Sequence, residues 1–201
     1  MSRLSHIPNL GGAKAFVLHR QHPTVQAISR QLAAIGLEVH DCWPDLPADV
    51  LAGDFVFFDV DMGFDEQFPW TPGAAPMPLI ALIGSEAPGR IEWALSHKAD
   101  AQLVKPISNS GVYSALLIAR QSFEARQRLA GEIAALEARV AERQTIVRAV
   151  GALSAQGFDD ERAYAQLRSL AMGWQVSLEE AARRVMAMTR EEEGDGHSRH
   201  A

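Results

Sequence analysis

The sequence of 201 residues contains a single cysteine, Cys42, and this scarcity excludes several classes of protein. One thiol cannot form an internal disulfide, so we expect the chain to fold in a reducing compartment. Its cysteine and histidines lack the spacing of a zinc site, so no metal is expected. No apolar run approaches the ~18 residues of a membrane span. Residues 1–12 lack the apolar core of a secretory signal. We therefore expect a cytoplasmic protein without a membrane partner.

Proline is absent after Pro106, which allows one long helix in the middle of the chain. From Leu129 to Val150, residues at alternating steps of four and three are apolar except Arg143, which is the a/d pattern of a coiled coil. A helix over 110–153 would be about 60 Å long, so we expect two chains to pair along it. An ordinary amphipathic helix packed on its own domain is the alternative. The predicted dimer seam consists of Leu129, Ile133, Leu136, Val140, Val147 and Val150.

The net charge of −6 is unevenly distributed along the chain. Residues 1–108 hold 7 Lys/Arg and 12 Asp/Glu, whereas residues 109–190 hold 11 arginines, 9 acids and no lysine. Arginine binds phosphate through a planar fork of N–H groups and stacks on bases. This weak cationic excess fits an RNA-binding surface, although a solvated helix would look similar. The acidic segment 191–201 has no apolar content, so we expect it to be disordered.

The first half of the chain alternates between short apolar strands and helices. A helix is expected from Pro23 to the residue before Gly36, and a second helix is expected from Pro88. Prolines and glycines in the segment 61–78 predict a long loop in place of a helix. Such an alternation indicates an α/β fold with a five-stranded parallel sheet. The expected strands are 15–18, 37–40, 55–58, 79–83 and 101–104.

Two further helices are expected after residue 153. Asp159 and Asp160 are typical of a helix N-terminus, and Ser177 with Glu180 has the form of a capping box. Together with the end of the central helix, they predict a small module of three helices. Phe158 is expected in the core of this module.

Residues 14–120 resemble the receiver domain of response regulators. The segment from Asp54 to Asp59 resembles the third receiver strand ending in its phosphoacceptor, and Lys105-Pro106 resembles the conserved pair after the fifth strand. The resemblance implies a flavodoxin-like sheet, whose functional edge lies at the C-terminal ends of the strands.

The receiver resemblance lacks the parts that hold a phosphoryl group. The acidic pair that binds Mg²⁺ is replaced by His19 and Arg20, the hydroxyl after strand four is missing near Ile83, and the third helix is absent. A guanidinium cannot bind Mg²⁺. We therefore expect Asp59 to be an inactive phosphoacceptor that pairs with Lys105 or Arg20. A conventional phosphorylated response regulator remains the alternative.

Residues 125–188 resemble the ANTAR domain, the RNA-binding module of transcription antiterminators. This sequence has Val150 where the family has a lysine and Ser154 where it has a methionine, which thins the basic surface. With Cys42-Trp43-Pro44 after the second strand, the whole order resembles the regulators of amidase operons. The matching residues are Arg143, Ile146, Ala149, Gly151, Leu153, Asp160, Glu161, Ala163, Leu167, Leu170, Ala171, Met172, Leu178 and Ala182.

These resemblances imply an RNA-binding antiterminator that is not an enzyme, with no catalytic residue and no cofactor. A homodimer would bind hairpins of leader mRNA and prevent a terminator from forming. A ligand-sensing regulatory protein would control it by docking on the receiver-like domain. Trp70, held between prolines, would either anchor this partner or fold back on its own domain. A protein-only adaptor is another alternative. The residues expected to contact RNA are Arg148, Arg162, Tyr164, Arg168, Trp174, Arg183 and Arg184.

The expected domain order follows directly. It is an N-terminal tail (1–13), a receiver-like domain (14–120), a coiled-coil helix (121–150), an overlapping ANTAR module (139–190) and an acidic tail (191–201).

Overall fold

The computed structural model describes residues 9–197 except 109, 156 and 158, with side chains as far as residue 189. Phe158, residues 1–8 of the expected N-terminal tail and residues 198–201 of the acidic tail lie outside the described residues. The chain folds as two compact units, residues 1–128 and 129–201. Within the described part, none of the helices combines the length and the hydropathy that spanning a lipid bilayer requires.

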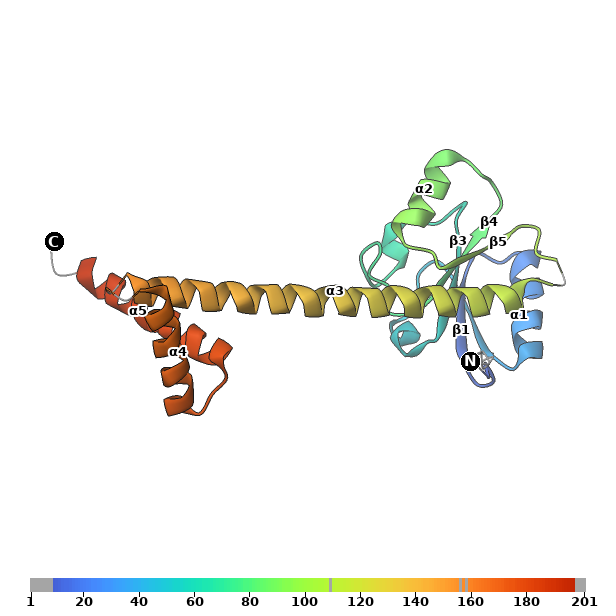
Figure 1. The fold of residues 1–201 in the computed structure, drawn as a ribbon. Coiled ribbons are helices and arrows are strands. Elements are labelled where there is room, and N and C mark those ends of the chain that lie inside the picture. The colour runs from blue at the N-terminus through green and yellow to red at the C-terminus, as the bar shows by residue number, and fades with distance from the viewer. Residues whose placement is uncertain (1–8, 109, 156, 158, 198–201) are drawn as a thin grey trace. The chain divides into compact units, whose positions relative to one another are not determined.

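The first unit is built on a parallel sheet of five strands in the order β2-β1-β3-β4-β5. Figure 1 labels β1, β3, β4 and β5 of this sheet. Every pair of neighbouring strands runs in the same direction. The central strand, β3, is buried along its whole length, because helices and loops cover both of its faces. The predicted α/β class with a five-stranded parallel sheet is therefore confirmed. The strands are β1 Lys14–Leu18, β2 Glu38–Cys42, β3 Phe55–Asp59, β4 Leu79–Ile83 and β5 Ala101–Val104.

Helices follow β1 and β4 at the predicted places. α1 (Pro23–Ile35) ends at Gly36, which takes the left-handed conformation (φ 100°) that favours glycine. α2 spans Pro88–Ser96, and the short 3₁₀ helix η1 spans Ala48–Ala52. Between β3 and β4, the described residues hold only one short 3₁₀ helix, η2 (Asp65–Gln67). The predicted absence of the third receiver helix is therefore confirmed. The prolines of this loop account for it, since proline interrupts a helix.

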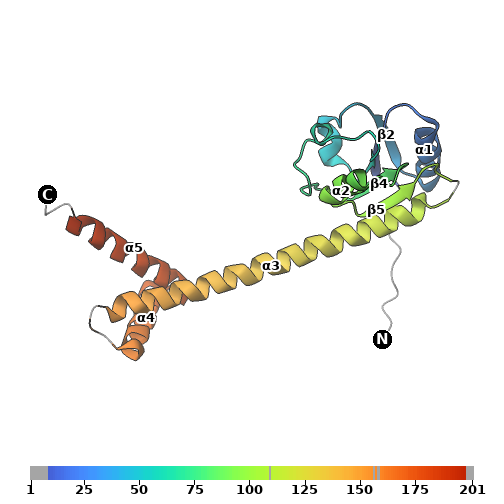
Figure 2. The ribbon, with the colours of Figure 1, turned by 90° about the horizontal axis from the view of Figure 1, so that it is seen from above.

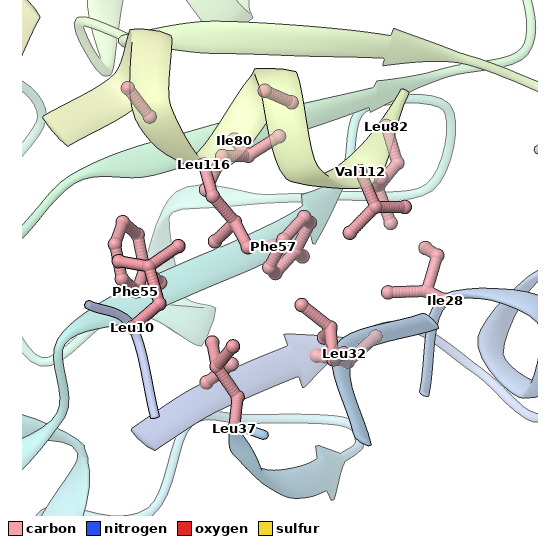
Figure 3. Packing of buried hydrophobic residues seen from close by; sticks show 14 of the residues in the cluster. Leu10, Ile28, Leu32, Leu37, Phe55, Phe57, Ile80, Leu82, Val112 and Leu116 are labelled. Carbon is pink, nitrogen blue, oxygen red and sulfur yellow. The ribbon is translucent and has the colours of Figure 1, made fainter. Parts of the chain in front are cut away.

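Two apolar layers hold the sheet in place. α1 and the first turns of α3 (Val112–Ser154) cover one face, where Val112 and Leu116 point toward Phe57 (Figure 3). α2 and the β3–β4 loop cover the other face, packed on Phe58. Each large apolar side chain that is fully buried in this way stabilises the fold by about 1.5–3 kcal/mol.

In the first unit, an ion pair connects α3 to the loop before β5, in addition to the apolar contacts of the helix. The carboxylate of Asp100 lies just before β5, accepts the N–H of Leu79 and pairs with the Arg126 guanidinium. Burial raises the pKa of Asp100, although the hydrogen bonds from Arg126 and Leu79 oppose that rise. After Arg126, every side chain from Gln127 to Gln144 is exposed.

The second unit packs α4 (Asp160–Trp174) and α5 (Leu178–His197) beside the last turns of α3 (Figure 2). Its core is rich in alanine, which lets the helices approach closely. Asp159 caps α4 by accepting the N–H of Arg162, and Ser177 caps α5 by accepting the N–H of Glu180. Over residues 191–197, part of the segment expected to be disordered, the structure continues α5 as a helix to His197, and glutamates favour helix.

Candidate functional sites

The C-terminal ends of the parallel strands bring three predicted residues together. Asp59 ends β3, and its Oδ1 lies 2.7 Å from Nζ of Lys105, which follows β5. His19 follows β1, and its Nε2 lies 3.5 Å from Oδ2 of Asp59. Asp59 and His19 are both buried. Of the two expected partners of Asp59, the structure places Lys105 beside it; Arg20 is exposed and lines the same cavity of about 360 Å³.

A fourth residue of this site, Asp61, was not predicted. Its Oδ2 lies 2.5 Å from Nζ of Lys105 and accepts the N–H of Gly84 at 2.9 Å, while its Oδ1 accepts the N–H of Ser85 at 2.8 Å. Partial burial alone would raise the pKa of Asp61, but the hydrogen bond from Lys105, the two N–H groups and the charge of Lys105 lower it. The sequence feature that could have indicated Asp61 is its position, two residues after Asp59, the C-terminal residue of β3.

The ammonium group of Lys105 lies between the two carboxylates, where a bound cation would neutralise them. Among the described residues, no three His, Cys, Asp or Glu side chains form a group that could hold a metal ion. The positive charge that contacts both carboxylates is that of the Lys105 side chain, which offsets part of their negative charge.

Trp70, which was expected either to anchor a partner or to fold back, packs on its own domain. Its ring lies 5.8 Å from that of Phe68, and its side chain is half-buried. The same loop is fastened by Asp65, whose Oδ1 accepts hydrogen bonds from Trp93 Nε1 (2.7 Å) and from the buried ring of His97 (3.0 Å). The second alternative for Trp70 is therefore the one observed.

In the second unit, the predicted RNA-contacting residues of α4 fall on two faces. Tyr164 and Arg168 are four positions apart, so they share one exposed face. Arg162 points to another side of the helix and lies 3.5 Å from Asp159. Arg148 is exposed on α3.

A second set of predicted residues lies on α5 and at the C-terminal end of α4. Arg183 and Arg184 both pair with Glu180, at 2.8 Å and 3.1 Å. The hydrogen bonds from Arg184 and Arg183 lower the pKa of Glu180. Trp174 is half-buried at the edge of the core, and the guanidinium of Arg184 lies over its ring at 5.7 Å.

The predicted dimer seam is exposed over most of its length. Exposed fractions run from 48% for Ile133 to 70% for Val147. Val150, by contrast, packs against the core of the three-helix module. A straight helix drifts by roughly 20° per heptad relative to a strict seven-residue repeat, which over three heptads turns the stripe by about 60°. This drift explains why Val150 leaves the exposed stripe.

The two halves of the chain match two different families of known proteins. Residues 13–120, more than half of the chain, match the family described as AmiR, N-terminal. The chain belongs to the AmiR family. Residues 134–186 of this AmiR-family chain match the ANTAR domain. The chain is therefore a transcription regulator with a receiver-like domain and an ANTAR domain.

Individual relatives cover most of the AmiR-family chain. The aliphatic amidase regulator of Pseudomonas aeruginosa is 26% identical over 179 residues, which are 86% of this chain and 90% of the relative. Among solved structures, the first receiver domain of ShkA in complex with c-di-GMP is 19% identical (TM-score 0.43), covering 55% of this chain and 95% of that one. Full-length FixJ from B. japonicum is 18% identical (TM-score 0.44), covering 88% and 98%.

Proposed function

We propose that the chain is an RNA-binding transcription antiterminator that acts as a homodimer on hairpins of a leader mRNA. The observation that carries this proposal is the ANTAR-matching module with Tyr164 and Arg168 on one exposed face of α4. A guanidinium binds phosphate, and a tyrosine ring stacks on an unpaired base with a gain of about 1–3 kcal/mol. Binding would hold the hairpin that excludes the terminator, so that transcription continues.

Pairing of two chains along α3 is supported by the exposed seam. Ile133, Leu136 and Val140 line a shallow apolar groove on the helix, and none of them is buried within the chain. Burying one such side chain against a partner gains about 1.5–3 kcal/mol. Two paired chains would present two ANTAR modules to one transcript.

Control by a docked regulatory protein is supported by a second apolar surface. A groove of about 550 Å³ between α2 and the edge strand β5 is lined by Ile91, Leu95 and Val104, with Glu86 and Glu92 among its other lining residues. It contains no lysine or arginine. Its chemistry fits a partner segment that presents apolar side chains flanked by Lys or Arg.

The RNA-binding proposal is tested by the salt dependence of affinity for the leader transcript of the neighbouring genes. Replacing Arg168 and Arg183 together by alanine should weaken binding and lower the salt slope by about two units, because two phosphate contacts are lost. Arg139→Ala, which removes an exposed arginine outside the α4 and α5 surfaces, should leave both unchanged. Absence of any affinity at low salt would favour a protein-only adaptor.

The docking proposal is tested by induction of a transcriptional reporter in cells that hold the neighbouring genes. Leu95→Arg should give constitutive expression, because a cationic side chain in the groove repels the partner. Leu51→Arg, an equally exposed leucine on η1, should remain inducible. Normal induction of the Leu95→Arg variant would contradict the proposed surface.

Incubation with acetyl phosphate and Mg²⁺ distinguishes regulation by a docked protein from regulation by phosphorylation of Asp59. We expect no label on Asp59, because Lys105 and Asp61 occupy the space around it. Stoichiometric labelling of Asp59 would instead establish a phosphorylated response regulator.

A further inference from the structure

Three hydrogen-bond donors converge beside Asp59, and a carboxylate of the chain itself occupies them. The donors are the N–H groups of Gly84 and Ser85, after β4, and the ammonium of Lys105, after β5. All three point at the two oxygens of Asp61, at 2.5–2.9 Å. Two adjacent backbone N–H groups and one cation form the donor set of an oxyanion site.

Gly84 is fitted to this contact. A Cβ at this position would lie 2.4 Å from Oδ2 of Asp61 and 2.9 Å from Cε of Lys105, both too close for a carbon atom. Its backbone is outside the left-handed region, so the requirement for glycine is one of space. Any larger residue would push the carboxylate out of the donor set.

The donors held by Asp61 are also those that an added group on Asp59 would need. Oδ1 of Asp59 lies 2.7 Å from Nζ of Lys105 and accepts the N–H of Asp61 at 3.0 Å. The oxygens of a phosphoryl group on Asp59 would meet the same ammonium. They would also meet the negative charge of Asp61, which repels them.

We propose that Gly84, Ser85 and Lys105 form an oxyanion site whose resident ligand is the carboxylate of Asp61, and that inorganic phosphate enters only when this carboxylate is removed. The loops after β3, β4 and β5 are thereby tied together by an internal anion without phosphorylation. The inference concerns the first unit alone, so its outcome is independent of RNA binding.

The test is a phosphate titration of the full-length ¹⁵N-labelled chain, followed through the amide resonances of Gly84 and Ser85, with chloride at matched ionic strength as reference. In the wild-type chain we expect neither resonance to respond. In the Asp61→Ala variant both should move in a saturable way over the same range of phosphate concentrations. Adding Lys105→Met to that variant should abolish the response. The matched control is Glu66→Gln, which removes an exposed acid of the same loop and should behave like the wild type.

Two results would overturn the proposal. One is a wild-type response to phosphate as tight as that of the Asp61→Ala variant; the other is an Asp61→Ala variant whose two amides ignore phosphate. A second measurement needs no variant. In the wild-type chain, acid titration should move the Gly84 and Ser85 amides together, below the usual aspartate range, as Asp61 is protonated. Amides that ignore this titration would also contradict the assignment.

Discussion

At the C-terminal edge of the sheet, the side chain of Lys105 contacts two carboxylates at once. Asp59 is almost completely buried and Asp61 only partly so, yet both lie within 2.7 Å of the same ammonium. An unpaired carboxylate in such a place would be costly to desolvate, and the lysine offsets that cost. Asp59 and Lys105, which resemble the residues of a phosphoacceptor site, are thus held in an ionic cluster at this edge.

The lowered pKa of Asp61 predicts a pH-dependent contribution to stability. A carboxylate whose pKa is lower in the folded chain stabilises it above the unfolded value of about 3.9, and this contribution is lost as pH falls through the folded value. Urea unfolding should show Asp61→Asn to be less stable than the wild type by about 1–3 kcal/mol at neutral pH. The difference should shrink in acid. A difference that stays constant from neutral pH to strong acid would exclude the charge of Asp61 as its source.

Cys42 is predicted to be unreactive in the folded chain. Burial, with the charges of Asp49 and Asp41, raises the pKa of its thiol to about 11. Because the thiolate is the reacting form, alkylation at pH 8 should be roughly 100-fold slower than in the urea-unfolded chain. Equal rates in the two states would show that the thiol is not shielded.

At the scale of elements, periodicity and punctuation predicted the strands, α1, α2, the long α3 and the missing receiver helix. These features depend on local chemistry, such as the proline-rich segment 61–78 and the glycine at position 36. Asp61 was missed because its partners come from β4 and β5, and no local pattern shows which loops meet at a sheet edge. Val150 was placed in the seam by a strict heptad, whereas the real helix drifts away from it.

The α5 surface yields a prediction about RNA affinity. Arg183 and Arg184 both pair with Glu180, so in the proposed RNA complex they would exchange that partner for phosphate. In the Glu180→Gln variant both guanidinium groups are released, and affinity for leader RNA should rise up to about fivefold. Glu132→Gln, which removes the same charge from an exposed position of α3, serves as the control. A larger gain from Glu132→Gln than from Glu180→Gln would show that α5 does not contact the RNA.

At the scale of the whole molecule, the chain consists of a receiver-like domain that carries its own anion and an ANTAR module, connected by a helix with an exposed apolar seam. The sequence was sufficient to indicate the family resemblance and the class of regulator. The pairing of side chains on α4 and α5 came from the structure, because it depends on which face each helix buries. The proposed mode of RNA binding depends on the pairing of two chains.

The most direct measurement is sedimentation equilibrium of the full chain, alone and with its leader RNA, at concentrations where RNA binds. Because two chains are proposed to pair along α3, we expect a particle of twice the 21.9 kDa chain mass that binds one RNA. Leu136→Asp should convert it to single chains and weaken RNA binding, whereas Glu137→Asp, on a neighbouring position of α3, should not. A wild-type chain that sediments as a single copy while binding leader RNA with full affinity would contradict the account.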